Sequence, residues 1–176
     1  MLINRQLTRT FYPIALLSSL IFFAQVGSAA ETYNVEDRLQ IMENLAQYSY
    51  RWDGKDSEGF ASLFTEDGIM ERQVGGELIP GSRVQGKAAI LDYASRSHQG
   101  RLADRQTRHH FSAVIFLQLS ADQAVTQNMA LITHQIAGGN PPFISGSGIY
   151  RITWRKTQQG WKMTRRVLHS DRFASQ

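Results

Sequence analysis

Apolar residues recur at spacings of three and four positions along residues 35–52. A period of about 3.6 places them on one face of a helix, and it predicts a helix from about Val35 to Trp52 that ends at Gly54. Asn34 is expected to cap the first turn, where Asp37 would also favour the helix. The apolar positions are Val35, Leu39, Ile41, Met42, Leu45, Ala46 and Tyr48.

The same period predicts two shorter helices. One begins at Asp56 or Ser57 and is closed by the turn Asp67-Gly68. Its apolar side consists of Phe60, Leu63 and Phe64. The other runs from Lys87 to His98 and lies between two glycines, which are typical of helix ends.

Beyond residue 100 the apolar period falls to about 2, which is typical of strands. Four long strands are expected, at Thr107 to Leu119, Ala124 to Ala137, Phe143 to Thr157 and Trp161 to Phe173. Their short polar or Gly- and Pro-containing connections predict an antiparallel meander. Two short strands should precede them, at residues 69–74 and around Arg83-Val84. Helices packed against one curved antiparallel sheet form an α+β fold.

Alternate side chains of the first long strand should share a face of the sheet. The face of His109 is otherwise apolar, so we expect it to point inward; its members are His109, Phe111, Ala113, Ile115, Leu117 and Leu119. The opposite face is mixed and contains His110, Ser112, Val114, Phe116 and Gln118.

The first thirty residues have the three parts of a secretory signal. Arg5 and Arg9 lie in a short charged start, residues 11–26 are almost wholly apolar, and small residues follow up to Ala30. Cleavage is expected after Ala29 or Ala30, which leaves a domain of residues 31–176 that is periplasmic or secreted and not bound to a membrane. The alternative is an uncleaved anchor helix, although the apolar run is short for a bilayer, which needs roughly 20 residues.

Charge and cysteine content exclude several classes of function. The whole chain carries a net charge of +4, and part of that excess belongs to the expected signal. The remaining cations are mixed with acids and form no basic stripe, so nucleic-acid binding is not expected. Because the chain has no cysteine, disulfides and thiolate metal sites are impossible.

Four local motifs resemble the SnoaL-like families of the nuclear transport factor 2-like superfamily. They are Phe60-Ala-Ser-Leu-Phe64, Thr65-Glu-Asp67-Gly-Ile69, Gly86-Lys-Ala-Ala-Ile90 and Gly160-Trp161-Lys-Met163, in the order of the family. The resemblance implies a cone in which a curved sheet wraps a pocket and helices close its side. It also implies a homodimer or another homo-oligomer, a small apolar cyclic or aromatic ligand, and no cofactor.

Two enzymes of that superfamily, scytalone dehydratase and lindane dehydrochlorinase, resemble the chain at its polar positions. Asp53 stands where both have an aspartate at the end of the first helix, and His109 where both have a histidine at the start of the first long strand. The resemblance implies that the histidine removes a proton from carbon and the aspartate orients it. His134 is similarly placed to a second catalytic histidine of the dehydratase, and Arg166 to a pocket arginine of the dehydrochlorinase.

Further residues would complete such a pocket. Phe111 and Ile115 could form its apolar wall, Trp52 could contact the substrate, and Tyr50 or His134 could polarise a substrate oxygen. Trp52 replaces a tyrosine of the dehydratase, and Tyr48 replaces a lysine of the dehydrochlorinase. Neither specific reaction is therefore expected.

Imidazole suits proton removal because its pKa starts near neutral pH, and a carboxylate on one ring nitrogen leaves the other free to act as a base. Plainer interpretations remain open. Asp53 could be a turn residue, His109 a structural histidine that Asp53 satisfies, and His134 a solvent-facing residue. A metal held by Asp53, His109 and His134 is a less favoured alternative.

Three functions follow from these alternatives. The first is an exported lyase or isomerase that removes a proton without a cofactor. The second is a binding or dimerisation module with the same pocket. The third, the small subunit of a ring-hydroxylating dioxygenase, agrees poorly with an export signal.

Overall fold

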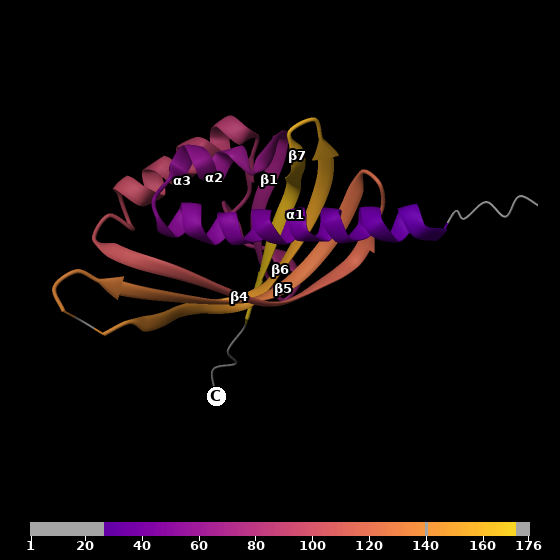
Figure 1. The fold of residues 1–176 in the computed structure, drawn as a ribbon. Coiled ribbons are helices and arrows are strands. Elements are labelled where there is room, and N and C mark those ends of the chain that lie inside the picture. Colours follow the sequence, from indigo (N-terminus) through magenta and orange to yellow (C-terminus); the bar gives the residue numbers. More distant parts are fainter. Residues whose placement is uncertain (1–26, 140, 172–176) are drawn as a thin grey trace, which may run out of the picture.

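The computed structural model describes residues 27–139 and 141–171, and it contains three helices on one side of a curved sheet (Figure 1). The helices are α1 (Gly27–Asp53), α2 (Ser57–Ser62) and α3 (Lys87–Gln99). The strands are β1 (Phe64–Val74), β2 (Glu77–Leu78), β3 (Val84–Gln85), β4 (Arg105–Leu119), β5 (Gln123–Ile136), β6 (Phe143–Thr157) and β7 (Gly160–Ser170). The predicted α+β cone is confirmed.

The sheet has the order β2-β1-β7-β6-β5-β4, and β3 pairs with β1. Strands β4 to β7 form the predicted antiparallel meander. The sheet is nevertheless mixed, because β1 pairs with β7 in parallel. This parallel pair is possible because α3 and the long strands separate β1 from β7 in the chain, which gives the connection ample length to cross over.

The first helix begins earlier than its capping signals suggest. It runs from Gly27 through Asn34, so Asn34 is not its N-cap. Asp37 is buried rather than part of a first turn. Its Oδ1 accepts hydrogen bonds from Lys156 Nζ at 2.7 Å and from Trp161 Nε1 at 2.8 Å, so it joins α1 to the ends of β6 and β7.

The predicted signal segment lies outside the described residues except for Gly27 to Ala30, which form the first turn of α1. Among the described residues, the helices are too short or too polar to span a bilayer.

The second helix also differs from its prediction. It ends at Ser62, and Phe64 is already the first residue of β1.

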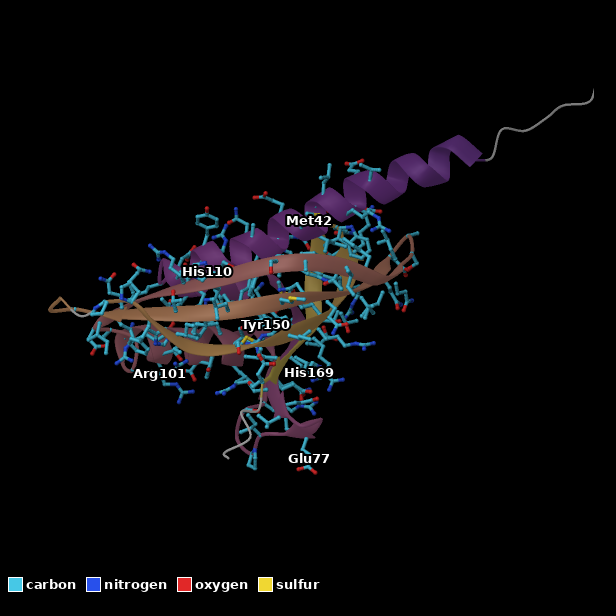
Figure 2. The ribbon with its side chains drawn as sticks, turned by 90° about the horizontal axis from the view of Figure 1, so that it is seen from below. Met42, Glu77, Arg101, His110, Tyr150 and His169 are labelled. Carbon is cyan, nitrogen blue, oxygen red and sulfur yellow. The ribbon has the colours of Figure 1, made fainter. Side chains whose placement is uncertain are left out.

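One face of α1 packs into the core through Ile41, Leu45, Tyr48 and Trp52. The other apolar positions of its pattern are exposed, among them Val35, Leu39 and Met42. Figure 2 shows α1 running beside the edge strand β4, with Met42 on the helix and His110 on the strand. This contact brings the end of α1 against the start of β4.

A β-bulge in β4 reverses which side chains point inward. The pairing with β5 shifts between Ser112 and Ile115, and Ala113 adopts a left-handed backbone with φ of 53°. Such an extra residue moves every following side chain to the opposite face. Val114 and Phe116 therefore pack against the core, and Ile115 is 52% exposed.

The predicted inward face of β4 is thus wrong beyond Phe111. Ala113, Ile115 and Leu117 lie on the outer face, while Leu119 returns to the core after a second shift near Gln118. Ile115 consequently does not form the wall of an internal pocket.

Candidate functional site

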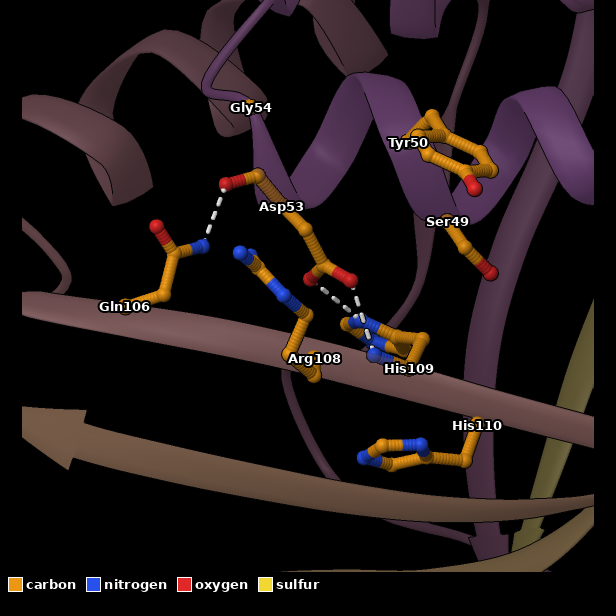
Figure 3. Close-up of a pocket in the computed structure, with 8 residues that line it drawn as sticks. All are labelled: Ser49, Tyr50, Asp53, Gly54, Gln106, Arg108, His109 and His110. Atoms are coloured by element: carbon orange, nitrogen blue, oxygen red, sulfur yellow. Dashed lines mark hydrogen bonds and ion pairs between the residues drawn. The ribbon is translucent and has the colours of Figure 1, made fainter. Parts of the chain in front are cut away.

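The end of α1 and the start of β4 bring Asp53 and His109 together. His109 Nδ1 lies 2.8 Å from Asp53 Oδ1, and each side chain is only 7% exposed. Figure 3 shows the two groups facing each other across the helix–strand contact.

Further hydrogen bonds hold this pair in place. Asp53 Oδ2 accepts the backbone N–H of His109 at 2.8 Å, and Asp53 Oδ1 accepts the hydroxyl of Thr107 at 2.6 Å. The side-chain amide of Gln106 donates to the backbone oxygen of Asp53 at 2.9 Å. Residues from three positions near the start of β4 therefore bind the last residue of α1.

These contacts also determine the charge of Asp53. Burial raises the pKa of its carboxyl, but the hydrogen bonds and charge of His109 and the hydrogen bond of Thr107 outweigh burial and leave the pKa below its usual value. Asp53 is therefore ionised at neutral pH. An ionised carboxylate only accepts hydrogen bonds, so the proton of a neutral His109 lies on Nδ1.

The other ring nitrogen of His109 can then act as a base. Within the described residues, Nε2 of His109 has no hydrogen-bond partner. His109 also lines a cavity of about 400 Å³ between the helices and the sheet. The other lining residues are Trp52, Arg72, Tyr93, Arg101, Leu102, Ile132, His134, Ser145, Gly146, Ser147, Leu168, Ser170 and Asp171.

Aromatic rings surround the imidazole. The ring centroid of His109 lies 6.4 Å from that of Trp52 and 6.0 Å from that of Phe111. Phe111 packs in turn against Tyr48 and Tyr150. Two of the predicted contacts of the site, Trp52 and Phe111, are therefore beside the histidine, although the cavity as a whole is more polar than the expected apolar pocket.

His134 faces the same cavity from β5. It pairs in register with Thr107, the residue two positions before His109. Burial lowers the pKa of His134, and the positive charges of Arg105 and Arg101 lower it further. The neutral imidazole is therefore favoured, with one N–H to donate and one nitrogen to accept.

Tyr50 lies outside this cavity. It is 77% exposed, and it lines an open groove of about 410 Å³ on the outer side of the Asp53–His109 pair (Figure 3). Residues two apart on a helix face different directions, so Tyr50 and Trp52 cannot both face inward.

Arg166 is buried but does not line the cavity either. Its guanidinium carbon lies 5.2 Å from the ring centroid of Tyr150 and 5.8 Å from that of Tyr48. It donates to the backbone oxygen of Glu71 at 3.1 Å. In the described part of the chain it therefore belongs to the packed core beneath the cavity.

Sequence patterns do not reveal three of the cavity residues. Tyr93 fits the apolar side of α3 by its spacing, and no pattern singles out Arg72 or Arg101. Arg101 Nη2 lies 3.3 Å from both Tyr93 Oη and Ser97 Oγ, to which it donates. Only the fold brings these side chains to one cavity, because they come from β1, α3 and the turn after α3.

A metal site at the cavity is not supported by the geometry. No group of three His, Asp or Glu side chains among residues 27–139 and 141–171 is arranged to hold an ion. Asp53 and His109 are instead directly hydrogen-bonded to each other.

Comparisons with known proteins identify the family and the fold of the chain. The family described as the SnoaL-like domain matches residues 34–167. No curated protein matches the chain. One similar solved structure is a Mycobacterium tuberculosis protein of unknown function, which is 25% identical over 86% of this chain and 80% of that chain, with a TM-score of 0.68.

Two further structures come from Novosphingobium aromaticivorans. A nuclear transport factor 2-like protein with a cystatin-like fold is 24% identical over 87% of this chain and 94% of that chain, with a TM-score of 0.72. A candidate scytalone dehydratase is 23% identical over 83% of this chain and 93% of that chain, with a TM-score of 0.68. These likenesses establish the fold.

Proposed function

The chain belongs to the SnoaL-like family, and on this premise we propose that it is a lyase or isomerase that removes a proton from carbon. The substrate would be a small cyclic or aromatic compound, and no cofactor is required. The observation that carries the proposal is the Asp53–His109 pair, which is buried, hydrogen-bonded at 2.8 Å and placed at a cavity wall.

In this mechanism His109 Nε2 takes the proton from carbon. Asp53 keeps the proton of the neutral ring on Nδ1, and its negative charge stabilises the imidazolium that forms. The low exposure of both side chains strengthens this stabilisation, because few water dipoles reach the pair to compete with it. Asp53 remains ionised throughout, as its lowered pKa requires.

His134 assists at the substrate oxygen. Its neutral ring can donate one hydrogen bond to a carbonyl or a leaving hydroxyl, which draws electron density away from the carbon that loses the proton. Tyr50, the alternative for this role, is excluded by its exposure. The similarity to a candidate scytalone dehydratase agrees with elimination chemistry in such a pocket.

The test begins with the compound itself. Small molecules retained by the purified mature protein would be identified by mass spectrometry and then incubated with the protein in deuterium oxide. Incorporation of deuterium at carbon is the expected result. If a ligand is retained but exchanges no hydrogen and undergoes no reaction, the chain is a binding module instead.

We also propose that the chain is exported. The charged start, apolar middle and small-residue end of residues 1–30 support cleavage after Ala29 or Ala30. Expression of the full chain in a bacterium should therefore give periplasmic protein whose N-terminus is Ala30 or Glu31, as determined by N-terminal sequencing. Recovery of only the uncleaved chain in the membrane fraction would contradict this proposal.

Pairing of two copies through the outer face of the sheet is the proposed oligomeric state. Its support is an apolar surface on neighbouring strands, formed by Ile115, Leu117, Met129 and Leu131, all of which are exposed in one copy. Such surfaces commonly mark interfaces. Light scattering should give about twice the mass of one mature chain, whereas a monomer at all concentrations would contradict the pairing.

A further inference from the structure

Two arginines line the cavity, and neither forms an ion pair with an acid among the described residues. Arg72 comes from β1 and Arg101 from the turn between α3 and β4. Several arginines elsewhere do pair with acids, including Arg105 with Asp104 and Arg155 with Asp67. Arg72 and Arg101 are both exposed side chains at the cavity wall, and they have no carboxylate within ion-pair distance in residues 27–139 and 141–171, as is also the case for the surface residues Arg38, Arg83, Arg108 and Arg151.

The positive charge of the cavity wall exceeds its negative charge. Asp171 is the acid among the lining residues, and its Oδ2 already accepts a hydrogen bond from Ser147 at 2.6 Å. His109 and His134 add no fixed negative charge. The wall therefore offers two guanidinium groups against one carboxylate, which favours an anionic ligand.

The hydrogen bonds of Arg101 leave its charge available. Its guanidinium donates only to the neutral hydroxyls of Tyr93 and Ser97 among the described side chains, both at 3.3 Å. Because Tyr93 Oη accepts from Arg101, its own hydroxyl hydrogen is free to donate to a ligand oxygen. The planar fork of a guanidinium matches the two oxygens of a carboxylate.

Trp52 connects the Tyr93–Arg101 pair to the imidazole of the base. The ring of Trp52 lies 6.0 Å from that of Tyr93, nearly parallel to it at 28°, and 6.4 Å from that of His109. Trp52 thus contacts both the Tyr93–Arg101 pair and the imidazole. The charge of Arg101 also lowers the pKa of His134, which shows that both side chains belong to one electrostatic site.

We propose that the substrate is a small ring compound that bears a carboxylate, which binds to Arg101 and Arg72 while a ring C–H faces His109. The carboxylate serves for binding and orientation, so the C–H must be activated by another group on the ring. The reaction part of this inference depends on the proposed function, but the binding part does not.

Calorimetric titration of the mature protein tests the binding part. The probes are benzoate and cyclohexanecarboxylate, each compared with its neutral amide. The acids should bind at least about tenfold more tightly than the amides, since a hydrogen bond to a charged group is stronger than a neutral one. Arg101→Gln should weaken binding of the acids about tenfold to a hundredfold and change binding of the amides little.

Arg96→Gln is the matched control. Arg96 lies on α3, pairs with Asp92 at the surface and does not line the cavity, so its loss should leave binding of the acids unchanged. Arg72→Gln should also weaken binding of the acids, as Arg101→Gln does. Equal binding of acids and amides, no binding of either acid, or full affinity for the acids in Arg101→Gln would overturn the inference.

The two proposals can fail separately. His109→Ala should still bind the acids, because the carboxylate is held by Arg101 and Arg72 and not by His109. Benzoate and cyclohexanecarboxylate, whose ring C–H is not activated, test binding alone. A retained ring acid with an activated C–H that binds through Arg101 but exchanges no hydrogen would leave the binding part standing and refute the proposed reaction. If only neutral ring compounds exchange a proton, the proposed reaction stands and the carboxylate inference is refuted.

Discussion

Replacement of His109 by alanine should lower the rate of proton removal from carbon by a factor of about a hundred to ten thousand. The protein would lose the only cavity imidazole that is held by a carboxylate among its described residues. The rate would be measured as deuterium incorporation into the retained ligand. His109→Gln should be similarly slow, because an amide preserves the approximate size of the ring but is not a base at neutral pH.

His110→Ala is a demanding control for this prediction. His110 is the next residue on β4, but it is exposed, lies on the opposite face and bonds Thr133 rather than Asp53. Its loss should leave the exchange rate nearly unchanged. If both variants were equally slow, the loss would reflect damage to β4 and not the chemistry of His109.

Replacement of Asp53 by asparagine should lower both the rate and the stability. The asparagine amide would donate a hydrogen bond, so His109 could turn to the tautomer whose proton lies on Nε2, and the rate should fall by about a hundredfold or more. With the amide nitrogen turned to the His109 ring, the remaining oxygen still accepts the backbone N–H of His109, but the hydroxyl of Thr107 loses its acceptor. The free energy of unfolding should then decrease by about 1–3 kcal/mol.

The stability effect should depend on pH in a defined direction. The carboxyl pKa of Asp53 is lower in the folded chain than in the unfolded chain. In the unfolded chain it is about 3.9. Its stabilising contribution is therefore fully present above that pH and is lost as the pH falls through the folded value. The difference between the wild type and Asp53→Asn should be largest near pH 7 and should shrink below about pH 4.

Urea unfolding at both pH values would measure this difference. Asp104→Asn is the control, since Asp104 is an exposed acid beside Arg105 in the turn that precedes β4. Its substitution should change the free energy of unfolding by less than about 0.5 kcal/mol. A constant difference between wild type and Asp53→Asn across the pH range would show that Asp53 is not ionised in the folded chain.

The sequence predicts the helices and strands well where the pattern is local and regular. The bounds of β6 agree with their prediction, and the meeting of Asp53 with His109 agrees with the expectation from the resemblance to the two enzymes. The start of α1 could not be predicted, because Asn34 is a suitable N-cap by residue type although the helix begins before it. The burial of Asp37 likewise depends on Trp161, which lies far away in sequence.

The cavity is harder to predict than the pair. Its wall combines side chains from α1, β1, α3, the turn after α3, β4, β5, β6 and β7, and the parallel pairing of β1 with β7 brings the first and last strands together. Tyr50 is adjacent in sequence to the correct helix face but points away from it. Ile115 is misplaced by simple alternation because the bulge occurs at Ala113, and alanine gives no local sign of a left-handed backbone.

The bulge at Ala113 has a consequence for comparing this chain with its relatives. From Thr107 to Phe111 the odd-numbered positions face the interior, but at Val114 and Phe116 the even-numbered positions do. An alignment that places a gap on the wrong side of Ala113 would exchange solvent-facing and interior residues over the distal half of the strand. Variation at position 115 in such an alignment therefore reports on the outer surface, and variation at position 111 on the packing of the interior.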